Sequence, residues 1–305
     1  MKWQKKGLIW SPDGSLPWAR HSALQPTAVA MGDFIRVFFG VRDDEGVGRP
    51  AYVDVAADDP SRVLKVADRP LLDVGEPGTF DDNGVVPCAV IRRDGQLLMH
   101  YAGYQLGVKV KFLAFGGLAI SDDGGESFDR YSQVPVLERT SEELYFKAAH
   151  CVLWDEGVWK IWYTGGSAFT EKDGLSFPVY DTRYVESSDG IHPNGKGEVC
   201  LMPQGGDEYR LGRGHVIKTD GLYRMIYARG TKSAGMQLGY AESTDGRVWT
   251  RKDEEVGLRL SDAGWDSRHI SYPNFCRVGD RVYLFYNGND YGKTGFGYAE
   301  LESWS

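Results

Sequence analysis

The chain has 305 residues and a formal net charge of −8 at pH 7, with 42% hydrophobic and 13% aromatic residues. An acidic chain lacks the basic surface that a phosphate backbone requires, so the composition argues against a nucleic-acid partner. No run of about 18 apolar residues indicates a membrane span, and the basic N-terminal segment lacks the apolar stretch of a secretory signal. We therefore expect a soluble, cytoplasmic protein with reduced thiols and no membrane partner.

Five segments along the chain share one pattern, in which a short apolar strand ends in an aromatic residue. They are 34–40 (FIRVFFG), 96–103 (QLLMHYAG), 158–166 (VWKIWYTGG), 222–230 (LYRMIYARG) and 281–289 (RVYLFYNGN). Their terminal aromatics are Phe39, Tyr101, Tyr163, Tyr227 and Tyr286. The pattern recurs about every 60 residues and covers the whole chain, which predicts five similar β units.

A second marker follows three of these strands and combines Ser, Asp-Gly and a later apolar or aromatic residue. It lies at 119–128, 185–192 and 241–249. Each copy predicts a third strand, a tight turn and a fourth strand, so we expect Asp122, Asp189 and Asp245 to have structural roles in turns. The cysteines Cys88, Cys151 and Cys276 lie on expected inner strands and are predicted to pack in the core.

The fifth unit reaches GYAEL at 297–301 and lacks a fourth strand, which the N-terminal segment 2–10 (KWQKKGLIW) can supply. Closure by strands from both termini would remove an exposed sheet edge. The sequence therefore predicts an all-β, single-domain protein over 1–305, a five-bladed β-propeller whose ring is closed by the N-terminal strand in the last blade. A β-sandwich with chance periodicity is the alternative.

In a propeller the inner strands begin around one central pocket, where loops on a rigid scaffold carry function. The five expected inner-strand starts are 20–26, 80–84, 142–147, 210–215 and 265–269, and each contains ionisable side chains. Carboxylates, arginines, histidines and Trp265 together suit a polar, ring-shaped ligand such as a sugar. We expect Trp18 or Trp265 either to stack on a sugar face or to pack in the core.

The marker Y-x-E-S-x-D-G-x-x-W at Tyr240–Trp249, together with the blade pattern, resembles the five-bladed glycoside hydrolase superfamily. This superfamily includes arabinanases, β-xylosidases, invertases, levansucrases and β-mannoside phosphorylases. The resemblance implies a carbohydrate-active enzyme with acidic residues on the first three blades. It places the second-blade carboxylate at Asp81 or Asp82 and the general acid at Glu142 or Glu143.

The first blade departs from that pattern, because Gln25 stands where the family has an aspartate. Hydrolysis usually needs two carboxyl groups, so Asp266 on the fifth blade, or Asp43 or Asp44, would have to replace it. A structural interpretation remains open for each candidate. Asp81 and Asp82 could form a turn, and at least one residue of the Glu142–Glu143 pair could be solvated.

Basic and polar residues at the same strand starts are candidates for substrate binding. They are Arg20, His21, Gln25, Lys147, His150, Arg213, His215, Trp265, Arg268 and His269. The cations could converge on an acidic sugar, a sugar phosphate or inorganic phosphate, or each arginine could pair with a neighbouring acid. The histidines lack a tight metal-ligand motif, so we expect them to hydrogen-bond a sugar and expect neither metal nor cofactor.

The sequence therefore supports three hypotheses for function. The first is a glycosidase-like enzyme acting on an oligosaccharide or glycoconjugate, with Glu143 or Glu142 as acid and Asp82, Asp81 or Asp266 as base. The second is a glycan-binding propeller that lacks catalysis. The third is a transferase or phosphorylase that uses an anionic, phosphate-bearing substrate.

Overall fold

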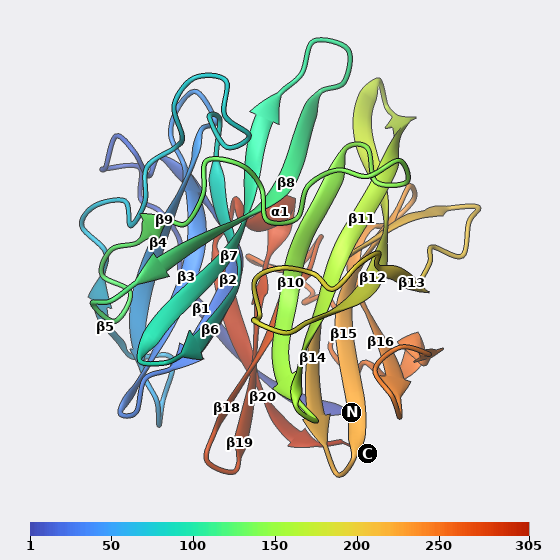
Figure 1. The fold of residues 1–305 in the computed structure, drawn as a ribbon. Coiled ribbons are helices and arrows are strands. Elements are labelled where there is room, and N and C mark those ends of the chain that lie inside the picture. The colour runs from blue at the N-terminus through green and yellow to red at the C-terminus, as the bar shows by residue number, and fades with distance from the viewer. Residues whose placement is uncertain (305) are drawn as a thin grey trace.

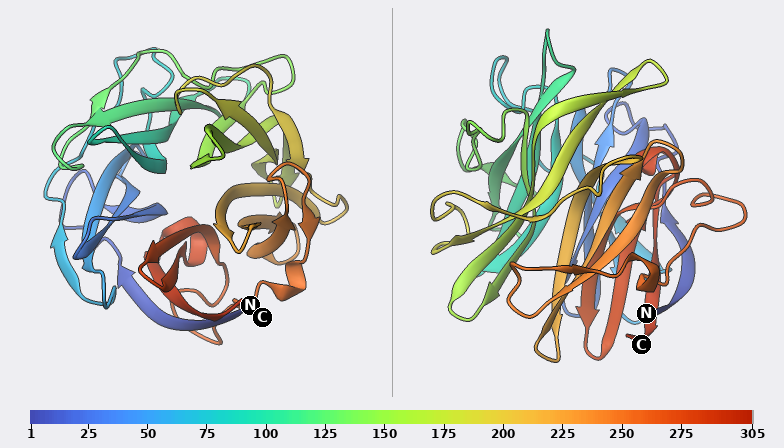
Figure 2. Two further views of the ribbon diagram at one scale, coloured as in Figure 1. Left: turned by 60° about the horizontal axis from the view of Figure 1, so that its bottom comes forward. Right: turned by 90° about the vertical axis from the view of Figure 1, so that its right-hand side faces the viewer.

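The computed structural model describes residues 1–304, which form five groups of four strands and two very short helices (Figure 1). Within each group, neighbouring strands are antiparallel. The innermost strands are β2 (His21–Ala30), β6 (Val85–Arg93), β10 (Phe146–Asp155), β14 (Glu208–Thr219) and β18 (Ser271–Val278). Figure 2 shows that the groups follow one another around a central axis.

The second strands carry the repeated aromatic pattern and confirm all five segments expected from the sequence. They are β3 (Phe34–Arg42), β7 (Gln96–Leu106), β11 (Val158–Lys172), β15 (Leu222–Thr231) and β19 (Arg281–Asn287). The third strands are β4 (Gly48–Ala56), β8 (Phe112–Ser121), β12 (Leu175–Ser187), β16 (Gly235–Ser243) and β20 (Phe296–Ser303). The outer strands are β5 (Val63–Val66), β9 (Asp129–Arg130), β13 (Glu198–Leu201), β17 (Thr250–Arg251) and β1 (Lys2–Trp10).

The N-terminal strand β1 lies at the outer edge of the group formed by β18, β19 and β20. It pairs antiparallel with β20 from Lys2–Ser303 to Trp10–Phe296. The pairing of the two chain ends predicted from the sequence is therefore confirmed. The groups β6–β9 and β10–β13 are also joined, by a short parallel contact of β8 with β10.

The third- and fourth-strand turns use the predicted Ser and Asp side chains. Asp189 accepts bonds from the hydroxyl of Ser187 and the amides of Ile191 and His192, and Asp245 forms the same set with Ser243. In the second group Asp123 has this role instead of the expected Asp122. A 3₁₀ turn, η1 (Asp253–Glu255), and a four-residue helix, α1 (Asn289–Gly292), complete the described elements.

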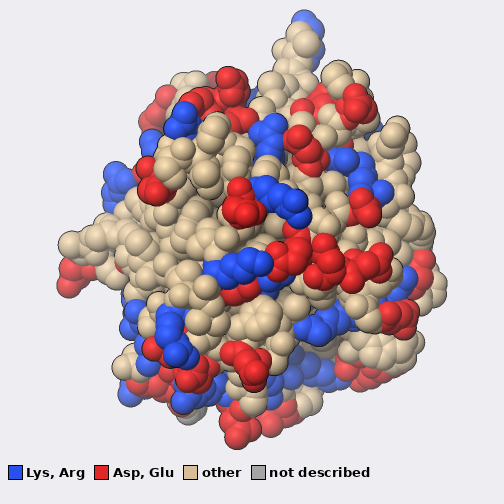
Figure 3. All heavy atoms as spheres, turned by 90° about the vertical axis from the view of Figure 1, so that its left-hand side faces the viewer, with Lys and Arg blue, Asp and Glu red and all other residues tan. Residues whose placement is uncertain are grey.

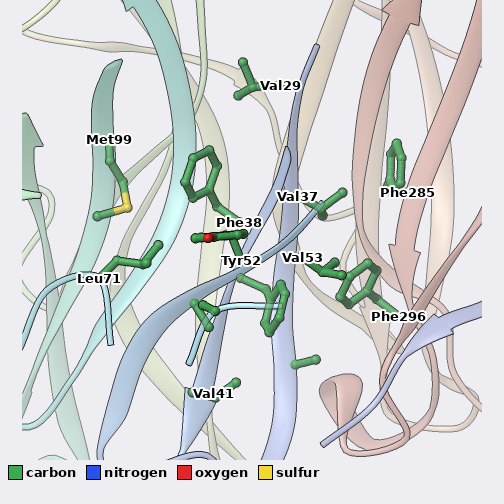
Figure 4. Packing of buried hydrophobic residues seen from close by; sticks show 14 of the residues in the cluster. Val29, Val37, Phe38, Val41, Tyr52, Val53, Leu71, Met99, Phe285 and Phe296 are labelled. Carbon is green, nitrogen blue, oxygen red and sulfur yellow. The ribbon is translucent and has the colours of Figure 1, made fainter. Parts of the chain in front are cut away.

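The core lies between neighbouring groups, where apolar faces of adjacent sheets meet. Figure 4 shows Phe38 and Tyr52 of the first group and Phe285 and Phe296 of the last group within one cluster. The terminal aromatics of the five second strands are at most 1% exposed. Glycines on the third strands make room for them, since a Cβ at Gly117 would lie 2.1 Å from the ring of Tyr101.

Candidate functional site

A cavity of about 430 Å³ lies on the side of the molecule where the inner strands begin, and all five groups line it. Each inner strand contributes at least one residue to the lining: Gln25 from β2, Val86 from β6, His150 from β10, Arg213 from β14 and Tyr272 from β18. The β3–β4 loop, the β7–β8 and β11–β12 hairpins and α1 form the rim. The predicted central pocket therefore exists.

Every inner strand has a register break at the cavity. The breaks lie between Leu24 and Thr27, Pro87 and Ala89, Ala149 and Cys151, Gly212 and His215, and Ser271 and Asn274. Such bulges redirect side chains and are common beside binding sites. At these breaks, Gln25, Arg213 and Tyr272 adopt φ values of 58°, 46° and 54°. Left-handed backbone at non-glycine residues is strained and concentrates at functional sites.

Arg213 lies at the cavity floor, and its side chain connects β14 to β2. Its guanidinium donates to Gln25 Oε1 at 3.0 Å, the Pro26 carbonyl at 2.9 Å and Thr27 Oγ1 at 2.6 Å. It is fully buried and forms no ion pair with any carboxylate of residues 1–304. Burial lowers the pKa of Arg213 to about 10, which leaves the group cationic at neutral pH.

Arg210, three residues earlier on β14, is a second buried cation without a carboxylate partner among the described residues. Its Nη2 donates to the Tyr291 hydroxyl at 2.7 Å, and the guanidinium lies over the rings of Tyr209 and Tyr180. Arg42 and Lys111 also line the cavity, and within residues 1–304 neither side chain has a hydrogen bond or ion pair. These four side chains make the cavity electropositive within an acidic protein.

Glu45, in the loop after β3, is the one carboxylate on the cavity lining of residues 1–304. Its neighbours Asp43 and Asp44 instead pair with Arg49 and Arg20. Neither of these two aspartates therefore replaces the missing first-blade acid. Lys147, the fifth cation of the lining, is neutralised by Glu143 at 3.1 Å.

The predicted catalytic carboxylates take part in a repeated structural contact. In four groups the terminal tyrosine of the second strand donates its hydroxyl proton to a buried or partly buried acid. The pairs are Tyr101–Asp81, Tyr163–Glu143, Tyr227–Asp253 and Tyr286–Asp266. A cation neutralises each acid: Arg130, Lys147, Arg251 and Lys5, respectively. The repetition explains these carboxylates as structural groups.

The structure does not support Glu143 as a general acid. Burial tends to raise the pKa of its carboxyl group, but hydrogen bonds from Tyr163 and Thr140 and the charge of Lys147 outweigh burial and lower the pKa. A general acid needs the opposite shift, because it must keep its proton near neutral pH. The partners of Glu143 thus favour its charged form, although the side chain is buried.

The other predicted catalytic residues do not line the cavity either. Glu142 is exposed and pairs with Lys196. Asp82 accepts the Gly78 amide at 2.8 Å, which is the turn role that the sequence left open. Asp81 and Asp266 are 0% and 2% exposed, respectively, and neither lies on the cavity lining. No two of the predicted catalytic carboxylates face each other across the cavity.

Of the ten predicted binding residues, the structure brings four together: Gln25, Lys147, His150 and Arg213. The other six do not line the cavity: Arg20, His21, His215, Trp265, Arg268 and His269. Arg20 pairs with Asp44 and Arg268 with Asp290. Trp265 stacks on Tyr286 at 5.1 Å, and His215 Nδ1 accepts the Phe275 amide. His21 bonds Ser22, and His269 accepts the Asp290 amide.

Sequence reasoning missed Arg42, Lys111 and Arg210, together with most aromatic residues of the wall. Arg210 lies in an identified strand start, but its spacing from Arg213 gave no sign that both face the cavity. His150 lines the cavity with Nδ1 unpartnered within residues 1–304, and burial lowers its pKa well below the usual value. Among the described residues, no three His, Cys, Asp or Glu side chains cluster as metal ligands.

A comparison with known proteins places the chain in a family. It is 33% identical to the uncharacterized protein Rv1502 of Mycobacterium tuberculosis (strain ATCC 25618 / H37Rv) over 99% of this chain and all of the relative. The chain belongs to the Rv1502 family. The MT1551 protein of strain CDC 1551 / Oshkosh, also uncharacterized, is 33% identical over the same length. No protein-family model matches the sequence.

Solved structures show the fold of this Rv1502 family member. A putative glycoside hydrolase from Bacteroides ovatus has a TM-score of 0.71 at 15% identity, covering 99% of this chain and 97% of that one. A structure from work on the GH130 family of mannoside phosphorylases, which contains hydrolases of β-1,2-mannosidic linkages in Candida mannan, scores 0.73 at 14% identity, covering 99% and 94%. The predicted resemblance to propeller glycoside hydrolases is therefore confirmed for the fold. No helix in residues 1–304 is long and apolar enough to cross a membrane.

Proposed function

We propose that this protein is a carbohydrate-active, closed five-bladed propeller whose central cavity binds an anionic sugar that bears phosphate or carboxylate. One observation carries the proposal: Arg210 and Arg213 are buried at the cavity without a carboxylate partner among residues 1–304. Burying a charge is costly unless an opposite charge or strong hydrogen bonds compensate it. Neutral oxygens and aromatic rings supply part of that compensation, and a bound anion supplies the opposite charge.

The other charged groups of the chain support this interpretation. The protein is acidic, with a net charge of −8, and most of its buried cations have carboxylate partners, as Arg36 has Asp54. The cavity departs from this rule. Among residues 1–304, no carboxylate neutralises four of its cations, and Glu45 is the one acid on its lining. Guanidinium groups bind phosphate and carboxylate through paired charge-assisted hydrogen bonds.

Hydrolysis by two facing carboxylates has less support, because Glu45 has no second acid opposite it on the described lining. Phosphorolysis is the second candidate, and it needs one acid only. Phosphate held by the arginines would attack the anomeric carbon, and the glycosidic C–O bond would break. Glu45 would relay the proton of the attacking hydrogen phosphate to the leaving oxygen, giving a sugar phosphate and a shortened glycan.

Titration calorimetry with glucose 1-phosphate, glucuronate, inorganic phosphate and glucose tests the proposal. Arg42→Gln is the informative variant, because Arg42 lines the cavity and no hydrogen bond or ion pair of residues 1–304 is lost with it. A charge-assisted hydrogen bond contributes about 1.5–3 kcal/mol, so anion affinity should fall about 10- to 150-fold. Arg268→Gln, which removes an exposed arginine outside the cavity, is the control.

Equal binding of glucose and the three anions would overturn the proposal, as would equal losses in the two variants. Product analysis with phosphate and a glycan then separates phosphorolysis from binding alone. Formation of a sugar phosphate supports catalysis. Retention of the intact glycan supports the binding function.

A further inference from the structure

The cavity wall formed by the β7–β8 and β11–β12 hairpins and the start of β10 is apolar, in contrast to the cationic floor. Phe112, Phe146 and Phe177 line it, and the ring centroids of Phe112 and Phe146 are 5.5 Å apart. Leu106 and Leu175 extend this wall to the rim, where they are 66% and 58% exposed. Since exposed apolar surface beside a cavity commonly marks an interaction site, the wall fits a ligand with a hydrocarbon portion.

The β7–β8 hairpin projects furthest at this end of the molecule (Figure 1). Val108 at its tip is 100% exposed, and Lys109 and Lys111 beside it form no ion pair within residues 1–304. No acidic residue occurs between Gly95 and Ser121. In Figure 3 the same projection shows lysine and uncharged atoms, whereas the body of the molecule mixes both charges.

We propose that the anionic sugar of the central cavity is carried on a lipid, and that the β7–β8 hairpin contacts the anionic membrane surface that holds this lipid. The inference rests on the proposed function for the anionic head, which the arginines bind. The aromatic wall and the two leucines bind the start of the hydrocarbon chain as it leaves the cavity.

Charge complementarity favours a membrane over other occupants of the exposed hairpin. A chain of net charge −8 is repelled by an anionic bilayer, so only a local basic projection can approach one. The tip combines an exposed valine with two lysines that form no ion pair within residues 1–304, a combination of apolar and basic side chains that suits a membrane interface. Its position on the cavity rim orients the opening toward the same surface.

Sedimentation with lipid vesicles tests the membrane contact. We expect the protein to bind vesicles of phosphatidylcholine with phosphatidylglycerol, and to bind phosphatidylcholine alone about 25-fold more weakly, since each lysine near an anionic surface contributes about fivefold. Val108→Asp and the double variant Lys109→Gln/Lys111→Gln should each reduce binding. Val248→Asp is the matched control, because Val248 is 76% exposed in the β16–β17 turn, outside the cavity lining.

Calorimetry with methyl phosphate and decyl phosphate tests the lipid part of the ligand. Wild type should bind decyl phosphate at least about tenfold more tightly, because buried methylene groups add affinity. Leu175→Ser, which shortens the apolar wall and adds no charge, should reduce this ratio. Binding of methyl phosphate by the wild type checks the proposed anion site separately from this inference.

Three results would overturn the inference. They are equal affinity for the two phosphates, absence of vesicle binding by a protein that binds methyl phosphate, and equal losses in Val108→Asp and Val248→Asp. Sedimentation equilibrium could instead show a dimer that Val108→Asp dissociates. A second copy of the chain would then cover the hairpin, and this result would also overturn the inference. Failure of methyl phosphate to bind would instead contradict the proposed function.

Discussion

The hydroxyl of Tyr101 donates a 2.9 Å hydrogen bond to Asp81 Oδ2, and the same oxygen accepts Nε of Arg130 at 2.8 Å. Equivalent contacts hold Glu143, Asp253 and Asp266 in three further groups. The first group has Phe39 at this position, which has no hydroxyl and packs against Trp10 at 4.8 Å. Each of the four tyrosines is paired with an acid. The contact accounts for Asp81, Glu143 and Asp266 near the starts of inner strands and for Asp253 in η1.

Replacing Asp81 should destabilise the fold. Asp81→Asn removes the charge that neutralises Arg130 and weakens the bond from Tyr101, so the free energy of unfolding should fall by about 1.5–3 kcal/mol. Asp82→Asn should change it by less than about 0.5 kcal/mol, since Asp82 accepts only a turn amide. Urea unfolding measures both. A loss of ligand binding by Asp81→Asn at unchanged stability would contradict the structural role.

Glu143 should make stability depend on pH in the acid range. Its folded-state pKa lies below the ordinary value because bonds from Tyr163, Thr140 and Lys147 outweigh burial. Its contribution is therefore complete above the ordinary glutamate pKa of about 4.3 and is lost as pH falls through the folded-state value. The difference in unfolding free energy between wild type and Glu143→Gln should shrink on acidification. A difference that grows toward low pH would contradict this assignment.

The strand pattern was predictable because it depends on local properties. Each aromatic that ends a second strand follows apolar residues that must be buried, and each Ser-x-Asp-Gly turn forms its own hydrogen bonds. Tyr286 and Tyr227 are thus found from the sequence. The pairing of β1 with β20 was also predictable, because a group of three strands leaves an edge that only the N-terminal segment matches.

The site was less predictable, because it depends on which way each side chain points. Arg210 and Arg213 both line the cavity. In a regular strand, residues three apart point to opposite faces of the sheet, but the register break between Gly212 and His215 lies beside Arg213. Arg268 was expected there and instead meets Asp290 on α1, a helix with no clear sequence signal. The structural role of Asp81 and Asp266 was likewise not predictable, because each contacts a tyrosine that lies 20 residues away in the sequence.

Removing β1 should expose an edge of the last group and cause aggregation. Deletion of residues 1–10 removes the pairing with β20, the Lys5–Asp266 ion pair and the contact of Trp3 with Phe275. We expect a large fall in melting temperature and in soluble yield, because unpaired strand edges associate. Lys2→Ala, which changes an exposed residue of the intact strand, should melt like the wild type. Equal melting of the truncated protein would contradict the role of β1 in the sheet.

Measuring both ligand binding and unfolding free energy distinguishes an arginine that binds the ligand from one that stabilises the fold. Arg210→Met should weaken anion binding by about tenfold or more and change the free energy of unfolding by less than about 1 kcal/mol, because an apolar side chain avoids burying an unpaired charge. Arg251 is the comparison: it is also largely buried, but it donates to Glu208 at 2.9 Å and Asp253 at 2.6 Å.

Arg251→Met leaves both carboxylates with fewer partners, so unfolding should become easier by about 2–3 kcal/mol, while anion binding stays near the wild-type value. Calorimetry and urea unfolding on the same preparations measure the two effects. If Arg210→Met unfolds as easily as Arg251→Met and still binds the anion, Arg210 is a structural residue and the electropositive cavity loses its main support.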